Sequence, residues 1–267
     1  MKTVVITGSA RGLGYEMAKC FRKKNFNVVI SDITKYEVNM AVDKLKEVNS
    51  KGELLGIVCD ITNDEQVVSL IEKTKKKFNI IDIWVNNAGI NQPDKMIWDL
   101  SSDEIDKMID VDLKGTIKIT KYVMEEMIKQ KYGAIYTVEG HGSNDAIIPG
   151  LSIYGTAKRG LTYFLTALAK EAEINKLDIM IGKLSPGIMI TDFLVNSFRN
   201  KKIELSDKNK KIYNILGDYP DVVAKFLVNK MINNTNNNVR FSWLTGKKAA
   251  WRFMTSGLKK RNFFDKK

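Results

Sequence analysis

The sequence predicts an α/β protein with a doubly wound, seven-stranded parallel sheet covered by helices on both faces. Apolar runs of strand length alternate with segments of helical period, a glycine-rich turn joins the first strand to the first helix, and polar motifs follow several strands. The chain has 267 residues, 44% of them hydrophobic, which is enough for a sizeable core. We expect one domain, residues 1–267, with a helical extension at its C-terminal end.

Apolar runs mark the expected strands, and apolar residues recurring every three to four positions mark the helices. The expected strands are residues 3–7, 27–31, 54–58, 81–85, 134–138, 179–184 and 239–244. The expected helices are residues 12–24, 36–49, 64–78, 101–130, 154–174 and 220–232. Ser101 and Glu104 form a capping-box pattern at the start of one of them.

Composition limits the class of protein. The two cysteines, Cys20 and Cys59, lie inside expected elements, and with a single histidine in the chain no metal site is expected. No apolar run has the length of a membrane span and no signal peptide is visible, so we expect a cytoplasmic protein. The net charge of +12 comes largely from scattered lysines, and no nucleic-acid partner is expected.

The first strand leads into the turn TGSARGLG, which precedes a helix. Glycines there let the backbone approach a pyrophosphate, which the helix N-terminus attracts. This is the dinucleotide-binding arrangement of a Rossmann fold. The candidate cofactor residues of this turn are Gly8, Ser9, Arg11, Gly12, Leu13 and Gly14.

Asp32 ends the second expected strand, where a carboxylate can accept hydrogen bonds from an adenosine ribose and would repel a 2′-phosphate. NAD is therefore the expected cofactor. Arg11 keeps NADP open as the alternative, because a guanidinium in the turn can hold a 2′-phosphate. An exposed carboxylate with no ligand is the plainer interpretation of Asp32.

Two further motifs follow the third and fourth expected strands. Asp60 is placed to accept from an adenine amino group, beside Ile61. The sequence NNAG, residues 86–89, offers a tightly turned wall along the cofactor, and Asn87, Ala88 and Gly89 are its candidate binding residues.

Tyr154 and Lys158 lie one helical turn apart and can share one helix face. Together with the glycine turn, Asp60, NNAG and the Pro186-Gly187-x-x-x-Thr191 pattern, this pair resembles the short-chain dehydrogenase/reductase family over about residues 1–195. Within that family, EGHGS, SPGIMITDFL and the basic, aromatic ending are similar to the chlorophyll(ide) b reductase branch and its bacterial relatives.

The resemblance implies roles for the pair. Tyr154 would protonate a carbonyl oxygen as nicotinamide delivers hydride, and Lys158 would lower the phenol pKa and bind the nicotinamide ribose. Pro186, Gly187 and Thr191 would complete the cofactor site, with Thr191 bonding the carboxamide. A plain surface pair is the alternative for Tyr154 and Lys158.

Two positions depart from the family pattern. His141 stands where the family usually has its catalytic serine, so we assign carbonyl polarisation to Ser143, with Gly140 and Gly142 giving the loop freedom. His141 either lines the site as a donor or faces solvent. Asp112 stands where the family commonly has Asn, whose main-chain carbonyl holds a water. That carbonyl survives the change, and the carboxylate could pair with Lys158.

Residues 188–219 form a long polar segment that we expect to be a substrate lid. Apolar residues that either line a substrate cleft or pack the lid are Ile148, Leu151, Ile188, Met189, Phe193 and Leu194. They would suit a fairly hydrophobic carbonyl or alcohol.

Residues 246–267 form a basic C-terminal extension, in which residues 247–267 hold eight Lys or Arg against one Asp. Packing on the sheet edge with lysines in solvent is favoured over a peripheral membrane contact. Since family tetramers usually end on the last strand, we expect a homo-oligomer that differs from that tetramer.

Three hypotheses follow. The first is an NAD(P)(H)-dependent carbonyl reductase or alcohol dehydrogenase with a small-molecule substrate. The second is a 3-oxoacyl carrier-protein reductase, since the positive surface would attract an acidic carrier. The third is a nucleotide-binding regulatory protein without turnover, suggested by the displaced serine and by Asp112.

Overall fold

The structure is a computed structural model that describes residues 1–93, 95–190, 207–258 and 261–264. Its centre is one seven-stranded sheet with the order β3-β2-β1-β4-β5-β6-β7, and all neighbouring strands are parallel. The strands are β1 Thr3–Thr7, β2 Asn27–Asp32, β3 Leu54–Val58, β4 Ile83–Asn86, β5 Gly133–Val138, β6 Ile179–Ser185 and β7 Val239–Ser242. The seven predicted strands are confirmed, with shifts at their ends.

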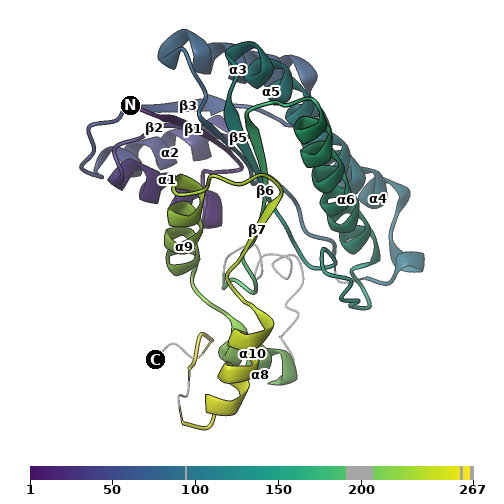
Figure 1. Ribbon diagram of the computed structural model, residues 1–267. Coiled ribbons are helices and arrows are strands. Elements are labelled where there is room, and N and C mark those ends of the chain that lie inside the picture. Colours follow the sequence, from purple (N-terminus) through teal and green to yellow (C-terminus); the bar gives the residue numbers. More distant parts are fainter. Residues whose placement is uncertain (94, 191–206, 259–260, 265–267) are drawn as a thin grey trace.

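Helices cover both faces of this sheet (Figure 1). They are α1 Gly12–Lys23, α2 Lys35–Lys46, α3 Asp64–Phe78, η1 Ile97–Asp99, α4 Ser102–Ile109, η2 Asp110–Gly115, α5 Thr116–Gln130, α6 Ser152–Ile174, α8 Asp207–Leu216, α9 Pro220–Ile232 and α10 Gly246–Thr255. One apolar core lies between the sheet and α1, α2 and α9, and a second lies between the sheet and α3, α5 and α6. The expected doubly wound architecture is confirmed.

The strand order fixes the position of the site. The chain winds from β1 out to β3, then returns to place β4 on the other side of β1. In such sheets, ligands bind beyond the carboxyl ends of the strands, where the winding reverses. The sequence motifs follow the carboxyl ends of β1, β2, β3, β4, β5 and β6, so they meet at this one edge.

The predicted helix 101–130 contains a π-helical interruption. Residues 110–115 form η2, between α4 and α5, and the Thr116 hydroxyl donates to the Val111 carbonyl at 3.4 Å. A side chain on Gly115 would collide with the Asp110 carbonyl, and it would crowd Ile61. Single π turns within helices are frequent at functional sites, and this one carries Asp112.

The expected lid is partly helical, because α8 occupies residues 207–216. Residues 191–206 lie outside the described residues. The two ends of the segment are joined by an isolated bridge between Met189 and Asp218, in which Ile190 and Asp218 donate to main-chain carbonyls at 3.0 Å.

Asp218 also ties the C-terminal extension to the rest of the molecule. Its carboxylate, 8% exposed, contacts Arg252 and Arg261 at 2.7 Å and accepts from the Trp243 indole at 2.6 Å. In Figure 1 the extension lies with α8 beyond the end of β7. Helix α10 buries none of its residues, and Met254 is 76% exposed, so apolar side chains as well as lysines face solvent.

Candidate active site

The turn after β1 packs directly on the turn after β4. Thr7 accepts hydrogen bonds from the amides of Asn87 and Ala88 at 3.1 Å, and the Asn87 side chain donates to the carbonyls of Thr7 and Gly8. Gly8 has φ of +59°, and an added Cβ would lie 2.6 Å from the Ala88 backbone. Only glycine suits this position, which brings the two predicted cofactor motifs together.

The glycine turn fits a dinucleotide phosphate. The first residues of α1 have no side-chain cap, so their N–H groups point beyond the helix end without an internal partner. Gly12 has φ of +59°, and an added Cβ there would meet only open space. These are the donor set and the clear approach that a pyrophosphate needs.

Asp32 and Arg11 flank this turn. The Asp32 carboxylate accepts from the Ala10 amide at 3.1 Å and the Ile33 amide at 2.9 Å, which holds it at the end of β2. Arg11 is exposed and lies 3.7 Å from Glu37, so an acidic neighbour compensates its charge. Asp32 is thus the more firmly placed of the two.

Other predicted cofactor residues have structural partners. The Ser9 hydroxyl donates to the Ile6 carbonyl at 2.6 Å and accepts from Ser31 at 3.0 Å, so it fastens the turn to β2. Leu13 and Ile61 belong to the two cores. The Asp60 carboxylate accepts from the Thr62 amide and hydroxyl.

Tyr154, Lys158 and Asp112 form a buried cluster. Their exposed fractions are 8%, 7% and 0%. The Lys158 ammonium lies 3.4 Å from the Asp112 carboxylate and 5.3 Å from the centre of the Tyr154 ring. The other Asp112 oxygen accepts from the Ile90 amide at 2.7 Å. The predicted ion pair between residues 112 and 158 is therefore present.

Each ionisation in this cluster depends on the others. Burial raises the pKa of Tyr154; Lys158 opposes this shift and Asp112 adds to it. Burial favours neutral Lys158, but the Asp112 carboxylate and the phenol more than offset that effect and raise its pKa. Burial raises the pKa of Asp112 against the attraction of Lys158.

Gln92 positions the start of α6. Its side-chain oxygen accepts from the amides of Ile153 and Tyr154, both at 3.0 Å, and its amide donates to the Lys95 carbonyl. Because α6 has no cap from Leu151, the buried Gln92 supplies one from a different loop. This lets the helix begin at Ser152, two residues before the predicted start.

The loop EGHGS approaches α6 through its glycines. A Cβ on Gly142 would lie 2.6 Å from the Gly155 backbone, and a Cβ on Gly140 would overlap the Tyr154 hydroxyl. Gly140 is thus the loop residue that faces the phenol. The Ser143 hydroxyl, buried among main-chain groups, donates to the Lys158 carbonyl and accepts from the Gly140 amide, both at 3.4 Å.

The remaining predicted residues lie near the end of β6 or outside the described chain. Gly187 has φ of +72° and packs against Leu244, and Pro186 is buried. Thr191, Phe193 and Leu194 lie outside the described residues. The His141 Nε2 atom is buried without a hydrogen-bond partner, and burial lowers the His141 pKa.

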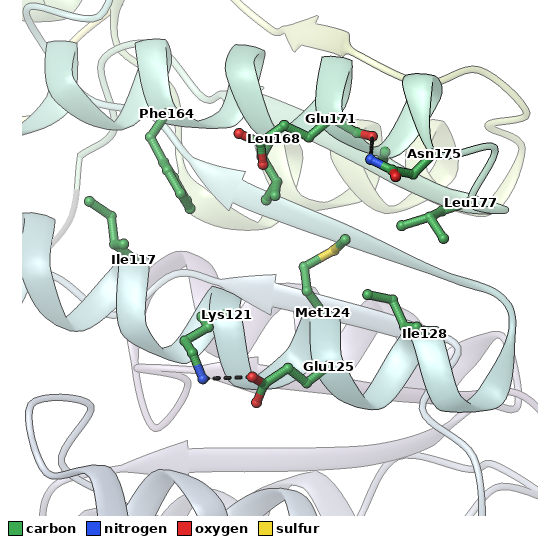
Figure 2. Close-up of a pocket in the computed structure, with 11 residues that line it drawn as sticks. Ile117, Lys121, Met124, Glu125, Ile128, Phe164, Leu168, Glu171, Asn175 and Leu177 are labelled. Carbon is green, nitrogen blue, oxygen red and sulfur yellow. Dashed lines mark hydrogen bonds and ion pairs between the residues drawn. The ribbon is translucent and has the colours of Figure 1, made fainter.

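A separate hollow of about 480 Å³ lies between α5 and α6 (Figure 2). Its apolar lining comes from side chains such as Met124, Phe164 and Leu168. None of the predicted site residues lines it, so it is distinct from the edge where the motifs meet. Within the described part of the chain, no helix is long and apolar enough to span a membrane, and no group of acidic, His and Cys side chains could hold a metal.

The family profile described as short chain dehydrogenase matches residues 2–202. The chain belongs to the short-chain dehydrogenase family. It is 30% identical over 280 residues to a probable chlorophyll(ide) b reductase, chloroplastic, of Arabidopsis thaliana, covering 99% of this chain and 55% of that protein. It is also 30% identical over 207 residues to a 3-oxoacyl-[acyl-carrier-protein] reductase of Chlamydia trachomatis serovar D, covering 76% and 80%.

Among solved structures, levodione reductase is similar with a TM-score of 0.81 at 23% identity, covering 93% of this chain and 98% of that one. This likeness concerns the fold. The chain spans about half the length of the first curated relatives it matches. The predicted membership of the short-chain dehydrogenase family, and the likeness to chlorophyll(ide) b reductases, are confirmed.

Sequence reasoning missed two residues that this short-chain dehydrogenase places against Tyr154. Gln92 follows the NNAG motif in an irregular loop, where no periodicity or motif marks it. Gly140 was expected to give the loop freedom, whereas its lack of a side chain makes room for the phenol. The signal that the sequence offered was the presence of glycines in both EGHGS and YGTAK. Two backbone segments can approach closely only where both carry small residues.

Proposed function

We propose that this chain is an oxidoreductase that uses NAD(P)(H) to transfer a hydride between nicotinamide and a carbonyl or secondary alcohol. The observation that carries this proposal is the buried Tyr154 phenol beside Lys158, at the sheet edge that also carries the glycine turn. A bound nicotinamide would supply the hydride. Relatives whose names describe reductases support the reaction class.

The chain's own groups would handle the proton. As the carbonyl carbon accepts hydride, its oxygen takes the proton of the Tyr154 phenol, and the resulting tyrosinate is stabilised by the Lys158 charge. Solvent then returns a proton to the tyrosinate. Ser143 is our candidate for polarising the substrate carbonyl. In that role its hydroxyl would release the main-chain carbonyl of Lys158 and donate to the substrate oxygen instead.

The cofactor would lie across the glycine turn. The N-terminal amides of α1 would hold the pyrophosphate, Asp32 the adenosine ribose, Asp60 the adenine, and Thr191 the carboxamide. NAD is preferred over NADP because Asp32 is fixed at the end of β2 while Arg11 is paired with Glu37.

Fluorescence titration with NADH and NADPH tests this preference. The wild-type protein should bind NADH more tightly, and Asp32→Asn should narrow the difference by removing the charge that repels a 2′-phosphate. Asp43→Asn, which removes an exposed carboxylate of α2, is the control and should change neither affinity. Tighter NADPH binding by the wild type would reject the preference for NAD.

Turnover of a panel of ketones and aldehydes, with Tyr154→Phe as the control, tests the reaction itself. We expect a fairly hydrophobic substrate, since Ile148 is 45% exposed in the loop before α6 and Ile188 and Met189 lie at the end of β6. Turnover that survives Ser143→Ala would make Ser143 a loop-positioning residue. Cofactor binding with no turnover of any carbonyl would favour the regulatory hypothesis.

A second candidate is a 3-oxoacyl carrier-protein reductase. The net charge of +12 and the Chlamydia relative favour it, because an acidic carrier would be attracted to a basic surface. Comparison of a 3-oxoacyl thioester on its carrier protein with the same thioester free in solution decides between the two.

A homo-oligomer is also proposed, with light scattering as its test.

A further inference from the structure

Asp112 is the one buried carboxylate in contact with the Tyr154–Lys158 pair among the described residues. It lies on the π-helical turn η2, which directs it toward Lys158, and one of its oxygens is fixed by the Ile90 amide. The oxygen that faces Lys158 is buried and has only that ammonium as its partner, at 3.4 Å. The carboxylate is thus held between the Ile90 amide and Lys158, out of contact with solvent.

Resting on the proposed function, we propose that Asp112 partly neutralises Lys158 and so keeps the Tyr154 phenol protonated, as the acid for carbonyl reduction, to higher pH. Two opposed charges in a buried site act on the phenol over a short distance, where water screens them little. With Lys158 alone, the phenol would lose its proton more readily. Asp112 is therefore a positioning residue that sets the pH range in which Tyr154 can act as the acid.

The other charged groups around the pair have ion-pair partners of their own. The protonation of the Tyr154 phenol therefore depends mainly on Asp112 and Lys158. On η2 itself, Asp110 is exposed and paired with Lys114 at 3.2 Å. On α4, Glu104 pairs with Lys95. On α5 and α6, Lys118 is paired with Asp64 and Arg159 with Asp145. In the loop before α6, the buried Glu139 is paired with Arg240 at 2.8 Å, and burial lowers the pKa of His141. The burial of Tyr154 and the negative charge of Asp112 both raise the phenol pKa, consistent with this assignment.

The direct test observes the phenol itself in the cofactor-free protein. Protein labelled with ¹³C at the tyrosine Cζ is titrated by NMR, and Tyr154→Phe identifies the Tyr154 signal. Asp112→Asn keeps the size of the side chain and the acceptor for the Ile90 amide while it removes the charge. We expect the midpoint of the Tyr154 titration to fall by about one pH unit or more in Asp112→Asn, because the charge that is removed is buried and little screened by water.

Asp110→Asn is the matched control, because it removes the same charge from the exposed face of the same turn. Its midpoint should stay at the wild-type value, since water and Lys114 screen that charge. The proposal is overturned if Asp112→Asn leaves the midpoint unchanged, or if Asp110→Asn shifts it equally. Thermal unfolding of both variants establishes that they are folded at the pH values used.

Kinetics give a second, separate readout. With a carbonyl substrate, the reduction rate of Asp112→Asn should decline at lower pH than that of the wild type, and the oxidation profile should move in the same direction. If no carbonyl is turned over, the proposed function fails while the NMR titration still decides the role of Asp112. If turnover is found and the pH profiles of Asp112→Asn and the wild type coincide, Asp112 does not set the working pH range.

Discussion

Gly140 shows how a single missing side chain can shape this site. The residue lies against the Tyr154 hydroxyl, where any Cβ would overlap the phenol oxygen. Its amide also donates to the Ser143 hydroxyl, so loop and phenol are fixed together. The position next to the phenol is therefore reserved for backbone, and the carbonyl of a substrate has to enter beside it.

Gly140→Ala should lower kcat at least tenfold and leave cofactor affinity nearly unchanged. The added methyl group displaces the phenol from its place near Lys158, whereas the glycine turn after β1 is untouched. Steady-state kinetics and NADH titration measure the two effects. Gly246→Ala, where a Cβ meets no atom within 4 Å, is the control and should behave like the wild type. Full activity in Gly140→Ala would show that Gly140 does not constrain Tyr154.

Helix α6 depends on a cap supplied from outside its own sequence. Gln92 accepts from two amides of its first turn, and it is 1% exposed. One of these two amides belongs to Tyr154. The contact that stabilises the helix therefore also fixes the backbone position from which the phenol extends. The positions of later residues of α6, such as Lys158, depend on where the helix begins.

Gln92→Leu should reduce the free energy of unfolding by about 1–3 kcal/mol, because it leaves one buried and one partly buried amide without an acceptor. Urea unfolding measures this loss. Asn63→Ala removes the exposed side-chain cap of α3 and should cost only about 1 kcal/mol. A loss in Gln92→Leu no larger than in Asn63→Ala would mean that water replaces the glutamine as the cap.

Sequence patterns predicted the elements whose cause is local. The strands read as short apolar runs, and the glycine turn and Tyr154-x-x-x-Lys158 are defined by residues close in the chain. The π turn at residues 110–115 and the start of α6 were not predicted, because they depend on contacts with Ile61 and Gln92, which are distant in sequence. Helix α8 was not predicted, because it lies in a polar segment without an apolar stripe wide enough to indicate a helix.

At the scale of the whole molecule, Asp218 joins the end of β7, α10 and the chain beyond it to the segment that follows β6. Burial raises the pKa of its carboxyl, but the hydrogen bonds from Arg252, Trp243 and Arg261 more than offset this and lower it. A carboxyl with a lowered pKa stabilises the folded protein above its unfolded pKa and loses that contribution as pH falls through its folded value.

Asp218→Asn should therefore reduce stability by about 2 kcal/mol or more near pH 7, because two arginines lose their counter-charge. The difference from the wild type should shrink as pH falls below the ordinary carboxyl value of 3.8. Urea unfolding at several pH values measures it. A difference that is constant from pH 7 down to the lowest pH at which the protein folds would show that the ion pairs are not its source.

Direct hydride transfer to a carbonyl with Tyr154 as the acid is the central claim, and isotope transfer tests it most directly. The protein is incubated with NADH carrying deuterium at both positions of C4 and with each carbonyl of the panel, and the alcohols are analysed by mass spectrometry. We predict one deuterium on the former carbonyl carbon in the wild type and no product in Tyr154→Phe. Alcohol without deuterium, or labelled alcohol formed equally well by Tyr154→Phe, would contradict the account.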